Sequence, residues 1–461
     1  MIVSGIQQAN ERITISKFLK KRCSKIKKVY SLEESIELVK NYIGLDFTTK
    51  DPINTNILKN KIYQRRILGE EKTSLTFEEA YALGTYLVGL GRNVLPRKLT
   101  LNEKRMYNSR CLAIAVGLQT AGTTPLEIAG LSAAIMDHDI LNYVCPKADN
   151  VLDNCGMGGD KILTPNVSTI SLLTIANYKG IKTSKHGSPG NTDSAGSSDF
   201  FSYLLKRRDK KKIIEKKFFD NGFPTKISPE KVAELIDNYG FFYTEAIDPK
   251  YKTIHLQTHF LGAVAHINDI LGPITSPITP EKIKRKVIGV NHLVSPTKVA
   301  EAYRIMNKKG STNIEKAYFI RGLGKFGMDE FSPFPDGTEV TILNKNKIET
   351  INVFPEDFGI KPVKPVVEDV FKGRYIIKDI SPHPLKNESG ALIKSRISEQ
   401  LLNNDIKGSM RDLIKINMSP LLIIENKVKN FKDGADLAEI LLNEKQGIKT
   451  INNLVSELLS D

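Results

Sequence analysis

Hydrophobic residues recur at helical spacing along the part of the chain that begins near residue 75. Three such segments follow one another, at 75–91, 109–122 and 123–138. Thr76 and Glu79 have the spacing of a capping box at the start of the first segment, and Pro125 suits the first turn of the third. Alanine, leucine and glycine at close spacing favour tightly packed antiparallel helices. The pattern predicts a small all-helical domain over residues 74–149.

Beyond residue 150, short strand-like runs alternate with helical ones. The strand-like runs lie at 151–155, 180–186, 286–291 and 316–323, and helical patterns at 168–179, 228–240 and 295–309. A hairpin is expected between 337–344 and 347–355, and helices return at 389–402, 408–427 and 433–459. This alternation predicts an α/β fold, with a larger domain over 150–461 and a mainly parallel central sheet. Ligands of such sheets bind beyond the carboxyl ends of the strands.

The first 73 residues form a separate segment with a helix-like pattern at 31–44, where Ser31 and Glu34 fit a capping box. Basic runs flank this pattern. They suit either an added nucleic-acid-binding module or a small helical extension with a solvated basic face, and no known motif accompanies them. The role of this extension is not indicated by its residues.

Composition restricts the class of protein. The chain has 461 residues, of which 40% are hydrophobic and 26% charged, as in ordinary globular proteins. No apolar run approaches the ~20 residues that span a bilayer, and no secretory leader is evident, so we expect a soluble, cytoplasmic protein without membrane contact. The four cysteines form no CxxC pair, which argues against zinc and disulfides. The net charge of +15 suits anionic ligands or reflects a lysine-rich composition.

The first candidate site is a glycine-rich turn after the strand-like run at 151–155. It runs from Asn154 to Asp160 and leads to a helix start that is rich in hydroxyl and amide groups, at Thr164, Asn166, Ser168 and Thr169. Glycines let backbone N–H groups approach an anion, and a helix N-terminus adds partial positive charge. The spacing is neither that of a P-loop nor that of a dinucleotide fingerprint. The turn therefore suits phosphate, although a simple tight turn has the same composition.

Two further stretches strengthen the phosphate interpretation. Lys185, His186 and Gly187 follow the next strand-like run and lead into a loop rich in glycine and serine that includes Ser197 and ends at Asp199. Lysine is a point charge that suits a phosphate oxygen. Asp329 and Glu330 form an acidic pair in a third glycine-rich loop, and such a pair facing phosphates can hold Mg²⁺.

These three stretches resemble the motifs of the anthranilate phosphoribosyltransferase family. GMGGDKILTPNVST resembles its glycine-rich signature, KHG with the serines that follow resembles its second phosphate loop, and GMDE resembles its acidic metal-binding pair. The resemblance extends over residues 75–461. The related class of pyrimidine nucleoside phosphorylases shares the architecture but has a differently built second loop, so it matches less well.

The resemblance implies a Mg²⁺-dependent transfer of the phosphoribosyl group from phosphoribosyl pyrophosphate to a small aromatic acceptor, in a homodimer formed through the helical domain. Lys185 and Asp160 would be catalytic, and Ser168, Asp329 and Glu330 would hold the metal. Gly156, Ser188 and Thr258 would face the acceptor. The residues implied in binding the donor are Gly156, Gly159, Asp160, Thr164, Asn166, Val167, Ser168, Thr169, Lys185, His186, Gly187 and Ser197.

The acceptor half departs from the family pattern. Ser188 and Pro189 stand where the family has asparagine and arginine, and Asp248 and Thr258 stand where it has a histidine and the arginine that contacts the anthranilate carboxylate. Losing that guanidinium removes a bidentate contact worth a few kcal/mol, on the order of a charge-assisted pair. We expect the three histidines nearby to be structural rather than compensating; they are His255, His259 and His266. The acceptor is therefore predicted only as an aromatic or heterocyclic amine.

Two other functions stay open. One is nucleoside or nucleotide phosphorolysis, in which phosphate replaces pyrophosphate. The other is a non-catalytic paralogue that binds nucleic acid, for which the basic run at 206–217 is the candidate surface. The same run also fits an exposed charged helix in a surface loop.

Overall fold

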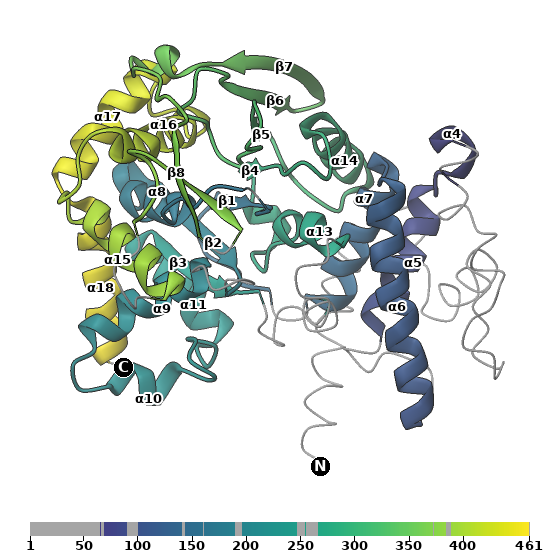
Figure 1. Ribbon diagram of the computed structural model, residues 1–461. Helices are drawn as coiled ribbons and strands as arrows, with labels where there is room; N and C mark the ends of the chain where they lie inside the picture. The colour runs from purple at the N-terminus through teal and green to yellow at the C-terminus, as the bar shows by residue number, and fades with distance from the viewer. Residues whose placement is uncertain are drawn as a thin grey trace. The chain divides into compact units, whose positions relative to one another are not determined.

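The computed structural model divides the chain into two compact units (Figure 1). The first comprises residues 1–143, 247–277 and 301–313, and the second 144–246, 278–300 and 314–461. The sequence placed the two later segments of the first unit in the α/β domain. The structure describes residues 65, 69–89, 100–140, 143–159, 161–189, 196–246, 254, 266–371, 373–383 and 389–460. The helix expected at 31–44 lies outside these residues.

The first unit is helical in the part that the structure describes. Its elements are α4 (Glu70–Thr73), α5 (Phe77–Gly89), α6 (Leu101–Ala121), α7 (Pro125–Ala134), η3 (Ile135–Asp139), α13 (Asn268–Ile274) and the later part of α14 (Pro296–Lys309). The capping box predicted for the first helix is confirmed, because Thr76 N donates to Glu79 Oε2 at 2.9 Å and Glu79 N donates to Thr76 Oγ1 at 3.2 Å. Helices α5 and α7 pack so closely that a Cβ on Gly84 would lie 2.6 Å from Ala134 Cβ. The small residues of these helices therefore serve packing.

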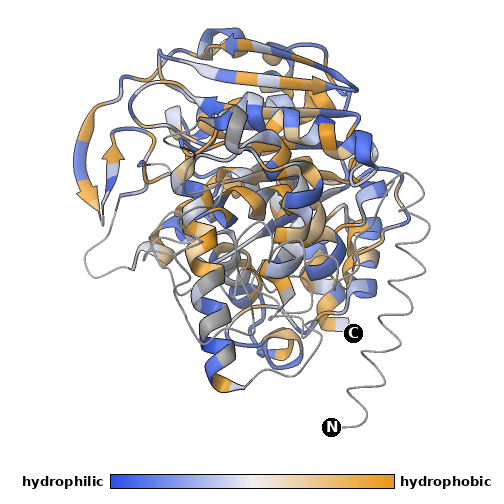
Figure 2. Ribbon diagram, turned by 90° about the vertical axis from the view of Figure 1, so that its right-hand side faces the viewer, coloured by the Kyte–Doolittle hydropathy of each residue, from blue (hydrophilic) through white to orange (hydrophobic). Residues whose placement is uncertain are grey.

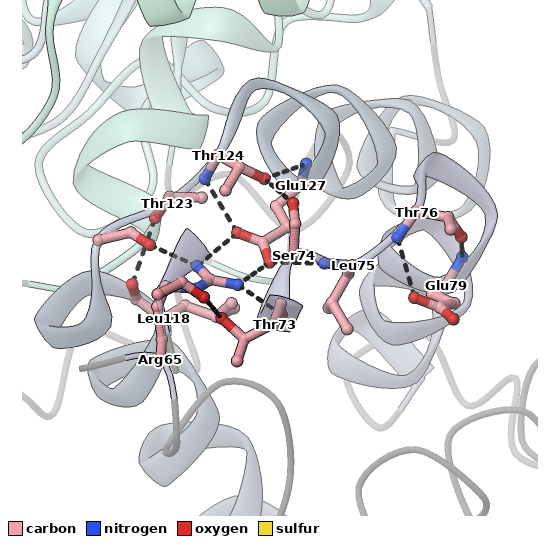
Figure 3. A network of polar contacts seen from close by, with 12 residues as sticks. Arg65, Thr73, Ser74, Leu75, Thr76, Glu79, Leu118, Thr123, Thr124 and Glu127 are labelled. Carbon is pink, nitrogen blue, oxygen red and sulfur yellow. Dashed lines mark hydrogen bonds and ion pairs between the residues drawn. The ribbon is translucent and has the colours of Figure 1, made fainter. Parts of the chain in front are cut away.

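A buried ion pair ties residue 65 to the start of α7 (Figure 3). The Arg65 guanidinium donates to both carboxylate oxygens of Glu127 and to the Gly122 carbonyl oxygen. Glu127 also accepts the N–H groups of Leu75 at 3.0 Å and Thr124 at 2.9 Å. Arg65 is 3% exposed and Glu127 is fully buried. The ion pair thus joins a residue that precedes α4 in the chain to the first turn of α7.

The second unit is built on a seven-stranded sheet in the order β3-β2-β1-β4-β5-β6-β7. Neighbouring strands from β3 through β5 are parallel, whereas β5–β6 and β6–β7 are antiparallel. The prediction of an α/β fold with a mainly parallel sheet, and that of the hairpin, are confirmed. The strands are β1 (Leu152–Gly156), β2 (Thr183–Gly187), β3 (Phe241–Glu245), β4 (Arg285–Gly289), β5 (Lys316–Gly322), β6 (Thr338–Asn344) and β7 (Lys347–Val353). A separate antiparallel hairpin consists of β8 (Val367–Phe371) and β9 (Arg374–Ile377).

Helices of the second unit lie against this sheet and against one another. Helix α8 (Val167–Ile175) contacts all four C-terminal helices, which lie together in Figure 1. These are α15 (Gly390–Leu402), α16 (Ser409–Ile424), α17 (Phe431–Asn443) and α18 (Gln446–Ser460). The others are α9 (Ser197–Arg208), α10 (Ile213–Phe218), α11 (Pro229–Tyr239) and the short turns η4 (Tyr178–Gly180), η6 (Pro280–Lys282) and η7 (Pro355–Phe358). Hydrophobic and hydrophilic residues alternate along many helices (Figure 2), as expected for helices that bury one side. No helix in the described part of the chain is long and apolar enough to cross a membrane.

Candidate active site

The glycine-rich turn begins where β1 ends, between the neighbouring strands β2 and β4. Gly158 and Gly159 have positive φ angles of 70° and 83°, a region that side chains disfavour, so the chain can reverse sharply here. A Cβ on Gly156 would lie 2.1 Å from the Asp329 carboxylate, so this position requires glycine for close approach. Gly158 N donates to Asp329 Oδ2 at 2.6 Å. The turn and the acidic loop, far apart in sequence, therefore meet.

Helix α8 starts in a buried setting behind this turn. Asn166 precedes the helix, and its backbone N and side-chain Nδ2 donate to Ser398 Oγ of α15 at 2.9 and 3.3 Å. Thr164 and Thr169 are buried, while Ser168 is partly exposed. Of the three predicted hydroxyl residues in this segment, Ser168 is therefore the one best placed to reach a ligand.

The second loop begins at β2 with a lysine that is turned inward. Lys185 is 3% exposed, and its Nζ donates to the His186 carbonyl oxygen at 2.6 Å and lies 3.5 Å from Cys155 Sγ. Because Cys155 belongs to β1, the ammonium group lies across the ends of the two strands. This position delivers positive charge to the point where both candidate phosphate loops start.

A cluster of buried ionisable groups supports these strand ends. Asp153 Oδ1 is 3.3 Å from His186 Nδ1, and Asp153 Oδ2 is 2.6 Å from Lys286 Nζ. Burial opposes ionisation of Asp153, but Lys286 and His186 lower its pKa below the usual value. Burial likewise raises the pKa of Cys155, but Lys185 and His186 outweigh it and bring the pKa to about 6. The two cations therefore favour the ionised form of Cys155 more than burial disfavours it.

The second loop continues from Gly187 to the start of α9. A Cβ on Gly187 would lie 2.0 Å from Ser197 Oγ, so the residue at the end of β2 and the first residue of α9 lie in contact. Ser198 donates to the buried Glu245 of β3, and its hydroxyl lies 2.7 Å from Tyr243 Oη. Burial raises the pKa of Tyr243 well above its usual value. The two ends of the loop are therefore held together at β2 and β3.

The acidic pair lies in a loop that is fastened on both sides. Gly322 N donates to the Met328 carbonyl oxygen at 2.8 Å, and Phe331 N donates to Asn417 Oδ1 of α16 at 2.9 Å. Asp329 and Glu330, between these anchors, are partly exposed. The glycine turn and the acidic pair predicted from the sequence are brought together by the Asp329 contact with Gly158.

The residues of this loop fit Mg²⁺ that arrives with a phosphorylated ligand. Among the described residues, no group of three or more His, Cys, Asp or Glu side chains is arranged to hold a metal by itself. Mg²⁺ is commonly held by one or two carboxylates while other oxygens come from water and substrate phosphates. The side chains of Asp329 and Glu330 in this loop, and of Ser168 in α8, carry only oxygen atoms as possible ligands, and oxygen is the ligand atom that Mg²⁺ prefers.

Several predicted residues lie outside the described part of the chain. These are Asp160, Asp248, Thr258, His255 and His259. The acceptor contact expected at Thr258 therefore stays a prediction, as does the replacement of the family's histidine by Asp248. His266 is described: it is 6% exposed, with its Nδ1 3.7 Å from Asp269 Oδ1, and burial lowers its pKa.

The basic run at 206–217 forms the end of α9, a turn and α10. Asp209 is buried and caps α10 by accepting the N–H groups of Ile213 at 2.8 Å and Glu215 at 2.9 Å. Arg207 and Arg208 pair with Glu399 of α15. The exposed lysines of the run are Lys206, Lys210, Lys211, Lys212, Lys216 and Lys217. The structure thus gives a lysine-rich surface, and its binding of nucleic acid stays a prediction.

Known proteins resemble this chain in sequence and in fold. Residues 217–446 match the model of the glycosyl transferase family α/β domain. The anthranilate phosphoribosyltransferase of Pyrococcus furiosus is 31% identical over 377 residues, which cover 81% of this chain and 94% of that protein. The same enzyme from Saccharomyces cerevisiae, solved in complex with phosphoribosyl pyrophosphate and magnesium, aligns with a TM-score of 0.64 at 17% identity, covering 89% of this chain and 99% of that one. The enzyme from Thermus thermophilus aligns with a TM-score of 0.60 at 22% identity, covering 87% and 99%.

The matched domain and the strand-end loops define a glycosyltransferase built on an α/β sheet. More narrowly, the chain belongs to the anthranilate phosphoribosyltransferase family. The family and the enzyme class predicted from the three motifs are confirmed.

Proposed function

We propose that this chain transfers the phosphoribosyl group of phosphoribosyl pyrophosphate to an aromatic or heterocyclic amine, with Mg²⁺ held by Ser168, Asp329 and Glu330. The observation that carries the proposal is the hydrogen bond of 2.6 Å from Gly158 N to Asp329 Oδ2. It brings a phosphate-type turn and a carboxylate pair to the same place, as a donor with a metal-bound pyrophosphate requires.

In this reaction the amine nitrogen attacks the anomeric carbon while the bond to pyrophosphate breaks, and the nitrogen loses a proton. The departing pyrophosphate carries high negative charge. Lys185, whose ammonium group lies beside the ends of β1 and β2, would contribute positive charge, and Mg²⁺, when bound, supplies more. The remaining contribution is positioning of the amine beside the sugar. No nucleophilic side chain is required.

The acceptor is the open half of the proposal. Ser188 is partly exposed next to Gly187, and it replaces an asparagine of the family pattern. Thr258 replaces the arginine of that pattern. A hydroxyl group cannot form the bidentate ionic contact that a guanidinium forms with a carboxylate. We therefore propose an acceptor that is recognised without that contact, and a screen of amines with and without an ortho carboxylate distinguishes the two cases.

A homodimer formed through the helical unit, a cytoplasmic location and a division into helical and α/β domains belong to the same proposal. Sedimentation equilibrium tests the dimer: a monomer at all concentrations would exclude it.

Calorimetry with phosphoribosyl pyrophosphate tests the donor. We expect binding that requires Mg²⁺ and that is lost when Asp329 and Glu330 are both replaced by alanine. A matched control replaces the exposed acidic pair Glu356 and Asp357 by alanine and should bind normally. No binding by the unmodified protein, with or without Mg²⁺, defeats the proposal. Release of free base that depends on orthophosphate would favour a phosphorylase instead.

A further inference from the structure

The β8–β9 hairpin is joined to the chain segment that directly follows the glycine-rich turn. Tyr375 N of β9 donates to the Lys161 carbonyl oxygen at 2.7 Å, and Leu163 N donates to the Tyr375 carbonyl oxygen at 3.0 Å. Ile162, between them, forms a parallel bridge with Tyr375. One edge of β9 therefore pairs with β8 and the other with this segment, so the exit of the glycine-rich turn is part of a small sheet.

The side chain of Tyr375 contacts the other loop of the site. Its ring meets the Phe326 ring edge-on, with centroids 5.7 Å apart and an interplanar angle of 71°. Phe326 is 5% exposed, and its ring also lies 5.6 Å from that of Phe334. Phe326 precedes Asp329 by three residues. Tyr375 thus contacts the segment after the glycine-rich turn through its backbone and the loop of Asp329 and Glu330 through its ring.

These contacts form a closed circuit. The chain runs from Gly158 to Leu163, across to Tyr375, then to Phe326 and Asp329, and the Asp329 carboxylate returns to Gly158. The two loops leave β1 and β5, which are separated in the sheet by β4. Because β1 and β5 do not pair directly, the hydrogen bonds of the sheet do not fix the distance between the tips of the two loops. That distance depends on contacts such as those of Tyr375.

Other residues secure the hairpin itself. Ile376 and Ile377, which follow Tyr375, are 1% and 0% exposed and supply a buried apolar anchor. Tyr375 is only partly buried. The hairpin is therefore expected to stay in place without the tyrosine ring, whose contact is with the acidic loop.

We propose that Tyr375 is a positioning residue that holds the glycine-rich turn and the Asp329–Glu330 loop at the separation required by a metal-bound pyrophosphate. The inference rests on the proposed function for the identity of the ligand. The mechanical coupling of the two loops rests on the contacts alone, so the two can be tested separately.

Three variants test the coupling by hydrogen exchange. Tyr375→Ala removes the ring, Tyr375→Phe keeps it, and Val367→Ser changes a position of β8 that is 39% exposed and pairs with Ile377 rather than with Tyr375. Peptides that cover 157–163 and 323–331 should both exchange faster in Tyr375→Ala and should be unchanged in the other two. Exchange that is unchanged in Tyr375→Ala, or that rises in only one of the two loops, overturns the proposal.

Donor binding is measured on the same proteins. We expect the Kd for phosphoribosyl pyrophosphate with Mg²⁺ to rise about tenfold or more in Tyr375→Ala and to stay within about twofold in Tyr375→Phe and Val367→Ser. In turnover, KM for the donor should rise more than kcat falls. Phe326→Leu, which weakens the circuit from the other side, should reproduce the loss if Tyr375→Ala is poorly folded. Normal donor binding in both variants overturns the positioning role. If the unmodified protein fails to bind the donor, the proposed function fails while the exchange result still decides the coupling.

Discussion

Glu127 offers a sharp test of how the helical unit is held together. Its carboxylate accepts N–H groups from Leu75 and Thr124 and two further hydrogen bonds from Arg65, all of them buried. In Glu127→Gln one acceptor oxygen becomes an NH₂ group, so a donor would face a donor, and the Arg65 guanidinium would lose its counter-charge in a site that is 3% exposed. Figure 3 shows how these groups converge.

The magnitude follows from burial. Breaking a buried ion pair by removing one partner costs about 3–5 kcal/mol, because the remaining charge stays desolvated. The capping interaction with Thr124 adds to the loss, at about 0.5–2 kcal/mol when a cap is removed. We therefore expect Glu127→Gln to lower the free energy of unfolding by at least about 3 kcal/mol.

The chain offers a matched control in the capping box of Thr76 and Glu79, which lies at the start of α5 and is exposed. Glu79→Gln should cost less than about 1 kcal/mol. The double variant Arg65→Met with Glu127→Gln should recover part of the loss, since replacing a buried pair by apolar groups is often nearly neutral. Urea unfolding followed by circular dichroism measures all three. If Glu127→Gln and Glu79→Gln differ by less than about 1 kcal/mol, the ion pair does not contribute as argued.

Three further predictions concern the α/β unit. Burial opposes ionisation of the Cys155 thiol, but Lys185 and the neighbouring histidine outweigh it and bring its pKa to about 6. The rate of Cys155 alkylation, measured by mass spectrometry, should therefore rise with pH around 6 and level off near pH 7. A midpoint near 8.5, the ordinary value for a thiol, would contradict this. Burial opposes ionisation of Asp153, but the neighbouring lysine and histidine lower the pKa of its carboxyl group. The ionised carboxylate therefore contributes its full stabilisation above the unfolded-state pKa of about 3.9, and this contribution is lost as the pH falls below that value. Asp153→Asn should make the free energy of unfolding less dependent on pH in acid, and an unchanged dependence would refute the assignment. If the lysines at 210–212 bind nucleic acid, their reversal to glutamate should reduce the slope of log affinity against log salt by about 3, while reversal of the exposed Lys345 and Lys347 should not; affinity independent of salt would end that hypothesis.

Long segments with a clear period were predicted well. Helices such as α11 and α14 combine helical spacing with polar flanks, and the parallel strands β1, β2, β4 and β5 are short strand-like runs between the helical segments. The strand β3 was missed because Phe241, Phe242 and Tyr243 form a continuous apolar run directly after a helix, which does not alternate. The β8–β9 hairpin was missed because β8 contains Glu368 and Asp369 among exposed valines, and its position depends on pairing with residues 161–163.

In the candidate site, too, some residues could be predicted from the sequence and others could not. Glycine, lysine and acidic motifs are local in sequence, so their residue types and order indicated a phosphate and metal site before their positions were known. The buried partners were not visible in the sequence: Lys286 sits in an apolar run like any strand residue, yet it lies 2.6 Å from Asp153 because β4 pairs with β1 in that register. Neither residue belongs to a motif, and only the strand order brings them together.

Gly289 explains how the acidic loop reaches the glycine-rich turn at all. The loop leaves β5, and the turn leaves β1, with the end of β4 between them. A Cβ on Gly289 would lie 1.6 Å from the Asp329 carbonyl oxygen, so any side chain at the end of β4 would push the loop away from Gly158. The loop can therefore cross β4 only over a glycine, and Asp329 then lies 171 residues along the chain from its hydrogen-bond donor. The donor half of the site thus depends on a glycine that belongs to none of the three motifs, because it acts by leaving space rather than by contacting a ligand.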